Sequence, residues 1–391
     1  MKVAFRTVWF QIPIFRGLGG SSMKKLTLGD VCKKESSNIA QKDIMECEGE
    51  YPIYGAGGFI KNVNFYQQEL PYIAVVKDGA GIGRTMLLPA YSSVIGTMQY
   101  ILPIDYESID LQYLYYAIVH MDLGKYFSGA TIPHIYFKDY KKEKLFLPEI
   151  CEQQRISLLL KQVDLMIEKQ NNQVELVDKL VQSRFVEMFG DTKINNKRWK
   201  TTKLLNILEK GSSVSYGIVQ TGDDIEGGVP VFRPIDIAGG HIPKISELKR
   251  TDKEISDKYK RTLLRGYELL ITVRGSVGET FQTNVEFNGC NVGRNIVPLR
   301  FDTDKVLYKY MENYFSQSGT KDVLASMTKG IALQGLNMSE FREIAIIIPP
   351  IELQKEFVRF AEAIDKSKSV IQKSLDELEI LKKSLMQKYF G

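Results

Sequence analysis

Few residues of this 391-residue chain have the types and spacing that catalysis requires. The turn Gly79-Ala80-Gly81-Ile82-Gly83 follows an apolar stretch, as do the glycine loops that bind nucleotide phosphates. Such a loop needs a third glycine and a following helix, because the helix N-terminus holds the phosphate. Arg84 stands where that glycine should be, and residues 85–91 read as a strand. The pattern therefore predicts a β-hairpin turn rather than a cofactor site.

An acidic group offers a second kind of chemistry. Asp236, Glu247 and Lys249 could bind Mg²⁺ and orient a water molecule, as carboxylates and a lysine do in metal-dependent nucleases. Such residues arise easily by chance in a charged segment, and the first half of the chain has no equivalent. We interpret the three as surface residues, with an autonomous Mg²⁺-dependent DNA endonuclease as the alternative.

The histidines and cysteines indicate neither a metal site nor a catalytic triad. His120, His134 and His241 are far apart in the sequence. The four cysteines form no CxxC pair: Cys32, Cys47, Cys151 and Cys290. Scattered thiols in a chain of this length favour the reducing cytoplasm over a disulfide framework, and no apolar run approaches the ~20 residues that cross a bilayer. We expect no catalytic residue, no metal and no cofactor on this chain.

Binding remains as the function that the residues could perform. The net charge is only +5, so charge alone does not indicate nucleic acid. Basic residues beside glycine turns could still enter a DNA groove, where arginine forms two parallel hydrogen bonds with guanine. Six candidates for DNA binding are Lys77, Arg84, Arg233, Arg274, Arg294 and Lys329. Each could equally be an ordinary surface cation.

The chain repeats itself at an offset of 201 residues. Residues 147–156, LPEICEQQRI, align with residues 348–357, IPPIELQKEF, through shared proline, isoleucine and glutamine positions. The alignment holds without a gap from residues 129–190 onto residues 330–391. One unit therefore occurs twice. In each copy, a globular part that differs between the copies is followed by a tail segment whose sequence is more similar.

Each tail is predicted to be a long amphipathic helix that begins just after proline. Apolar residues step by four and three from 156 to 188 and again from 357 to 389, which is the spacing of a coiled-coil seam. The apolar seam residues are Ile156, Leu160, Val163, Ile167, Val174, Val177, Phe357, Ile364, Ile371, Leu375, Leu378 and Leu385. We expect the helices to form an antiparallel coiled coil about a pseudo-twofold axis. Two separate helices, each packed on its own domain, are the alternative.

The globular parts mix strands and helices, so an α+β class is expected. In the first part, residues 72–76 read as a strand and 110–119 as a helix. In the second, residues 268–273 read as a strand and 306–315 as a helix.

The chain resembles the specificity subunits of type I restriction-modification systems. Residues 129–156 and 330–357 are similar to the segment that ends each target-recognition domain of that family and opens each spacer helix. FRPIDIAGGHI at 232–242 and TVRGSVGE at 272–279 resemble its recognition-domain pattern. The resemblance covers nearly the whole chain after residue 23, so residues 1–23 are expected to be an extension outside the family pattern.

The resemblance implies a division of the chain. Target-recognition domain 1 would span 24–147, spacer helix 1 would span 148–190, target-recognition domain 2 would span 191–347, and spacer helix 2 would span 348–391. Each domain would read one half of a split, asymmetric target in double-stranded DNA.

The resemblance also implies partners. The helices would set the spacing of the half-sites and dock two methylation subunits, which would bind S-adenosylmethionine and methylate adenine at N6. Restriction subunits would supply ATP-driven translocation and cleavage, with ATP and Mg²⁺ on the partners. This chain would be a non-catalytic subunit without a cofactor and without membrane contact. The alternatives are the endonuclease above and a helical scaffold that binds no nucleic acid.

Overall fold

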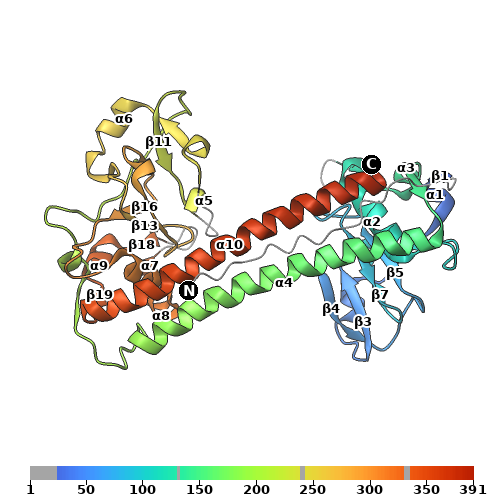
Figure 1. Ribbon diagram of the computed structural model, residues 1–391, viewed down its shortest axis with the longest axis horizontal. Helices are drawn as coiled ribbons and strands as arrows, with labels where there is room; N and C mark the ends of the chain where they lie inside the picture. The colour runs from blue at the N-terminus through green and yellow to red at the C-terminus, as the bar shows by residue number, and fades with distance from the viewer. Residues whose placement is uncertain (1–23, 130–132, 238–242, 330–334) are drawn as a thin grey trace, which may run out of the picture. The chain divides into compact units, whose positions relative to one another are not determined.

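The computed structural model describes residues 24–129, 133–237, 243–329 and 335–391 (Figure 1). The extension at residues 1–23 lies outside this part. Contacts divide the chain into two compact units, one of residues up to 170 together with 374–391, and one of residues 171–373. Each unit holds one globular head and part of both long helices, α4 (Ile150–Phe189) and α10 (Ile351–Phe390).

The first head is built around a four-stranded antiparallel sheet of order β2-β8-β5-β6. Its strands are β2 (Cys32–Ser36), β8 (Met98–Pro103), β5 (Tyr72–Val76) and β6 (Thr85–Leu88). Because side chains alternate along a strand, Ile73 and Val75 of β5 pack with the helix α2 (Leu111–His120), and Tyr72 and Ala74 pack on the other face. Both central strands are therefore buried on both faces.

Smaller elements complete the first head. A second sheet has the order β4-β3-β7, and β1 pairs with β9 directly before α4. These elements and two short helices are β3 (Tyr51–Gly55), β4 (Gly58–Val63), β7 (Ser93–Val94), β1 (Lys24–Thr27), β9 (Lys144–Leu147), α1 (Leu28–Val31) and α3 (Phe137–Tyr140).

The second head repeats this plan. Its central sheet has the order β14-β13-β16, and β10 pairs with β19 before α10 as β1 pairs with β9 before α4. The central strands are β13 (Leu269–Thr272), β14 (Thr280–Gln282) and β16 (Ile296–Leu299), and the pair is β10 (Thr201–Lys203) and β19 (Ala345–Ile347). The helix α7 (Tyr308–Ser316) packs on β13 through Tyr310 and Met311, as α2 packs on β5.

The second head also has a smaller sheet of order β12-β11-β15 and the pair β17–β18. These strands and the remaining α-helices are β11 (Val229–Phe232), β12 (Lys249–Thr251), β15 (Asn291–Val292), β17 (Thr328–Lys329), β18 (Gly335–Leu336), α5 (Pro234–Ile237), α6 (Lys253–Asp257), α8 (Ser318–Ser326) and α9 (Met338–Glu343). Single 3₁₀ turns lie at Gln41–Ile44, Leu123–Tyr126, Leu204–Ile207, Ile245–Glu247, Lys260–Thr262 and Val285–Phe287. The α+β class and the doubled head-and-helix plan are confirmed.

A buried glutamine fixes the start of each long helix. Gln153 donates to the carbonyl oxygens of Pro148 (2.8 Å) and Ser108 (3.0 Å) and accepts from the N–H of Asp110 (2.9 Å). Gln354, at the 201-residue offset, makes the same three kinds of bond to Pro349 (2.9 Å), Lys305 (3.1 Å) and Leu307 (3.0 Å). The glutamine shared by the two repeats therefore ties the first turn of each long helix to the segment that precedes the helix of its own head.

The two long helices pair with each other in both units. In the first unit, the Oδ1 of Asp164 in α4 lies 2.6 Å from the Nζ of Lys382 in α10. The Nε2 of Gln170 in α4 donates to the Oγ of Ser374 in α10 at 2.8 Å. In the second unit, Asp178 contacts Lys368 (2.6 Å) and Arg184 contacts Glu356 (3.0 Å). Residue numbers rise along α4 as they fall along α10, so the helices are antiparallel. The alternative in which each helix packs only on its own domain is wrong.

The predicted seam frame lies along this contact. Every position of the frame on both helices is buried or half-buried. Gln170, Arg184, Lys368 and Lys382 interrupt the apolar frame, and each makes one of the polar contacts across the helix pair. Polar residues at seam positions fix the register of a coiled coil.

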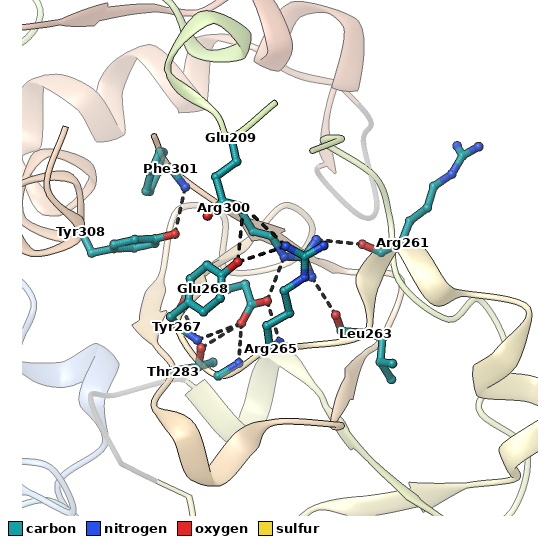
Figure 2. Close-up of polar contacts among 11 residues, drawn as sticks. Glu209, Arg261, Leu263, Arg265, Tyr267, Glu268, Thr283, Arg300, Phe301 and Tyr308 are labelled. Carbon is teal, nitrogen blue, oxygen red and sulfur yellow. Dashed lines mark hydrogen bonds and ion pairs between the residues drawn. The ribbon is translucent and has the colours of Figure 1, made fainter. Parts of the chain in front are cut away.

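The second head contains a buried ion pair between Glu268 and Arg300 (Figure 2). The fully buried Glu268 accepts from the Nε of Arg300 at 2.9 Å, and the guanidinium also donates to the carbonyl oxygens of Arg261 and Leu263. Backbone N–H groups that donate to the same carboxylate come from Arg265, Gly266 and Tyr267. Burial by itself raises the pKa of Glu268, but these hydrogen bonds and the charge of Arg300 outweigh it and lower the pKa below 4.5.

Among the described residues, no helix is long and apolar enough to cross a membrane.

Candidate nucleic-acid interface

In both heads the central strand ends in a glycine turn. Gly83 donates its N–H to the carbonyl of Val76 at the end of β5, and Gly278 donates to Thr272 at the end of β13, both at 2.9 Å. Gly83 has φ +80°, and a Cβ there would lie 2.4 Å from the nitrogen of Gly124, so only glycine fits. The strands β5 and β6 pair antiparallel around the turn, which is the hairpin that the sequence predicts.

The backbone just beyond these strands is bonded in the same way in both heads. The N–H of Lys77 donates to Thr97 (3.0 Å), and that of Val273 donates to Asn295 (2.8 Å). The carbonyl of Lys77 then accepts from Ile135, and that of Val273 accepts from Leu336, which is 201 residues further along. Lys77 and Val273 are therefore equivalent positions, and so are the next residues, Asp78 and Arg274.

A cavity opens at this place in the first head, with a volume of about 490 Å³. It is lined by Lys34, Ser36, Lys77, Asp78, Gln99, Ile135, Tyr136, Phe137, Lys138 and Lys141. The Asp78 carboxylate contacts the Nζ of Lys77 and lies 2.7 Å from the Nδ1 of His134. Burial raises the pKa of Asp78, but the hydrogen bonds and charges of Lys77 and His134 outweigh it and lower that pKa below 3.8. Asp78 is therefore an anion, and it can accept hydrogen bonds from a ligand.

The equivalent cavity of the second head has a volume of about 430 Å³. Its lining is Tyr216, Val219, Val273, Arg274, Arg294, Asn295, Gly335 and Leu336, with no carboxylate among these residues. The side chains of Arg274 and Arg294 are exposed, and within the described ranges neither guanidinium has a hydrogen-bond or ion-pair partner. The Oδ1 of Asn295 is buried on the wall of the same cavity, and it has no hydrogen-bond partner among the described residues. This cavity therefore presents positive charge and the N–H donors of two arginines, together with one unpaired acceptor, the Oδ1 of Asn295.

The structure sorts the six basic candidates. Lys77, Arg274 and Arg294 line the two cavities. Arg84 donates to the carbonyl of Ala56 at 2.7 Å instead. Lys329 lies in β17 with its backbone paired to Gly335, and its side chain lies outside the described part of the structure.

Arg233, the sixth candidate, is bound to Asp236, at 3.1 Å from its Nε and 2.8 Å from its Nη2. Asp236 is also one of the two carboxylates in the group that could bind Mg²⁺, and its contact with Arg233 occupies both of its oxygens. The ammonium group of Lys249 donates a hydrogen bond to the carbonyl oxygen of Gly222. The carboxylate of Glu247 accepts a hydrogen bond from the backbone N–H of Lys244. Across the described ranges, no cluster of three or more His, Cys, Asp or Glu residues could hold a metal ion.

Asp78, Asn295 and Tyr136 also line the cavities, although the sequence pattern does not predict them as site residues. Their positions depend on contacts between the strand ends and segments 20 to 63 residues further along the chain. The signal that could have found Asp78 is its place two residues after the strand in one repeat, because Arg274 lies two residues after the strand of the other.

Several known proteins that resemble this chain are specificity subunits of type I restriction enzymes. The family described as Type I restriction modification DNA specificity domain matches residues 20–176 and 192–380. The chain is 26% identical over 290 residues to the type I restriction enzyme EcoBI specificity subunit of Escherichia coli, a match that covers 67% of this chain and 61% of that protein. It thus spans less than two thirds of that relative's length.

A second relative is the type I restriction enzyme MjaVIII specificity subunit of Methanocaldococcus jannaschii, 22% identical over 336 residues, which are 80% of this chain and 77% of that protein. Among solved structures, the S subunit of a type I restriction-modification system from M. genitalium is similar in fold. Its TM-score is 0.56 and its identity 17%, with coverage of 95% of this chain and 97% of that chain. A chain from a study of complex assembly in the type I R-M system gives a TM-score of 0.51 at 15% identity, covering 94% and 97%.

Proposed function

The chain belongs to the family of type I restriction modification DNA specificity domains, and from this premise we propose that it is the DNA specificity subunit of a type I restriction-modification complex. Each head reads one half of a split target in double-stranded DNA. The observation that carries this proposal is the pair of equivalent cavities, since each lies at the same strand end and presents basic side chains. Their linings differ, so the two half-sites differ and the target is asymmetric.

The long helices supply the surface for partner subunits. Leu158, Leu165, Leu176 and Leu180 of α4 are exposed, and their spacing places them on one face of that helix, away from seam residues such as Leu160. Exposed apolar side chains at regular helical spacing are typical of a docking surface. We propose that two methylation subunits dock on the helices, and that helix length sets the gap between the half-sites.

In this proposal the chain itself performs no chemistry. The methylation subunits bind S-adenosylmethionine and methylate adenine at N6, and the restriction subunits use ATP and Mg²⁺ for translocation and cleavage. The complex acts on DNA in the cytoplasm.

A map of DNA modification tests the proposal. This chain is expressed with its methylation subunit in a host that lacks DNA methylation, and modified bases are located by single-molecule sequencing. We expect a split, asymmetric motif that disappears when this chain is omitted. A complex that assembles and yet modifies no sequence would contradict the proposal. So would plasmid cleavage by the purified chain with Mg²⁺ that Glu247→Ala abolishes.

A further inference from the structure

The residues at positions 78 and 274 have opposite charge although they are structurally equivalent. Asp78 follows Lys77, and Arg274 follows Val273, whose N–H and carbonyl groups are bonded in the same way. The backbone of Asp78 is paired with His134, and that of Arg274 is paired with Gly335, which is 201 residues after His134. Both line the cavity of their own head. The two heads therefore differ in charge at a place where their backbones are bonded in the same way.

This difference indicates contact with bases rather than with phosphates. The phosphates of the two half-sites are alike, so side chains that only bind phosphate have no reason to reverse their charge between the heads. Base edges differ in their donors and acceptors, and a protein that reads two different half-sites must differ where it meets them. Positions 78 and 274 meet that requirement.

The donor set of the second cavity fits guanine. In the major groove guanine presents two acceptors, N7 and O6, and a guanidinium donates two parallel N–H groups with matching separation. Arg274 and Arg294 have no partner in the described part of the chain, so no internal ion pair must break before they bind. Arg233 differs in this respect because Asp236 already occupies its donors.

The lining beside the two arginines supports specific contacts. Val219, Val273 and Leu336 form apolar walls around them. Once DNA covers the cavity, these walls would exclude water, which strengthens hydrogen bonds to a charged group. In the first head, Lys77 and His134 already bind the Asp78 carboxylate, but its oxygens have lone pairs for further hydrogen bonds. At the equivalent place this carboxylate would repel the acceptor atoms of guanine and suits the exocyclic amine of cytosine or adenine.

We propose that Arg274 and Arg294 read guanine in the half-site bound by the second head, whereas the first head, with Asp78 at the equivalent position, reads a base that donates a hydrogen bond. This inference rests on the proposed function and names the base chemistry of the same two sites.

The test uses the complete complex and five variants of this chain, four in the second head and Asp78→Asn in the first. Arg274→Ala and Arg294→Ala remove one guanidinium each, and Arg274→Lys keeps the charge but loses the two parallel donors. Arg261→Ala removes an exposed arginine of the same head that does not line the cavity. Modified sites are mapped by sequencing, and binding is measured on oligonucleotides in which each position of the motif is varied.

For the cavity variants we expect discrimination to fall about 10- to 100-fold at one or two guanine positions of one half-site, with the other half-site unchanged. Arg274→Lys should relax the same position as Arg274→Ala, and Arg261→Ala should leave the motif intact. In the first head, Asp78→Asn should change one position of the opposite half-site only.

Two results would overturn the inference. One is a uniform loss of affinity across all sequences, largely restored in Arg274→Lys, because that is the behaviour of a phosphate contact. The other is a motif without guanine in the half-site that the second head reads. In both cases the wild-type complex still modifies a split motif, so the specificity function stands. A wild-type complex that modifies no sequence would instead overturn the specificity function and this inference together.

Discussion

Glu268 shows how a single charge is kept inside the second head. Its carboxylate is fully buried, but backbone N–H groups and the guanidinium of Arg300 satisfy its oxygens, and Arg300 in turn binds two backbone carbonyls (Figure 2). A buried charge costs much less when its partners are complete than when one of them is missing. The network joins the loop before β13 to the end of β16.

We therefore predict that Glu268→Gln destabilises the chain by about 3 kcal/mol at pH 7, since it leaves Arg300 buried without a counter-ion. The pKa of Glu268 is lower in the folded state, so its stabilising effect is full above the unfolded pKa near 4.5 and is lost as the pH falls through the folded value. The difference in unfolding free energy between wild type and Glu268→Gln should thus shrink below about pH 4.5. Denaturant unfolding at pH 7 and pH 4 measures it.

The matched control for this prediction removes both charges. Glu268→Leu combined with Arg300→Met should be less destabilised than Glu268→Gln, because no buried charge remains unpaired. If Glu268→Gln has the same stability as wild type at pH 7, the carboxylate does not hold Arg300 in solution.

Among the helices and strands, the local spacing of apolar residues predicted much of the fold. The seam spacing predicted both long helices, and Pro148 and Pro349 lie just ahead of them. The strand expected at 72–76 is β5, and the helix expected at 110–119 is α2, which begins one residue later because the Asp110 carboxylate caps it by accepting from the N–H of Tyr113.

Local pattern could not predict the cavities. Their walls form where strand ends meet segments that are remote in the sequence, and no periodicity encodes that register. The contact of Arg233 with Asp236 was within reach, because the two stand three residues apart at the start of a helical turn. The domain boundaries at 147/148 and 347/348 stay a prediction.

The helix pair permits a test of the spacing proposal. Four residues inserted into α4 after Gln170 advance the seam by one of its own steps, so the helices can still pair in a shifted register. We expect a motif with the same half-sites and a different gap. A single inserted residue rotates the helix by about 100° and should prevent assembly. Normal assembly with an unchanged gap after the four-residue insertion would show that the helices do not set the spacing.

At the scale of the whole molecule, each head begins and ends on paired strands. Lys24 of β1 faces Leu147 of β9, and Thr201 of β10 faces Ile347 of β19. A head can therefore be replaced as one piece, because its two connections to the rest of the chain lie side by side.

We predict that replacing residues 24–147 with the corresponding segment of a relative changes one half of the recognised sequence and leaves the other half and the gap intact. The modification map of the complex measures this directly, and replacement of residues 201–347 should change the opposite half. A graft that changes both halves, or neither, would show that the heads do not read DNA independently.

The two equivalent glutamines, Gln153 and Gln354, link the folding of each head to the long helix that follows it. Each binds the segment that leads into the helix of its own head, so a long helix has a fully bonded first turn only when that head has folded. A damaged head would then weaken the helical surface on which partner subunits are proposed to dock. In the proposed complex, such a chain should fail at assembly and so direct no modification to a wrong place on the genome.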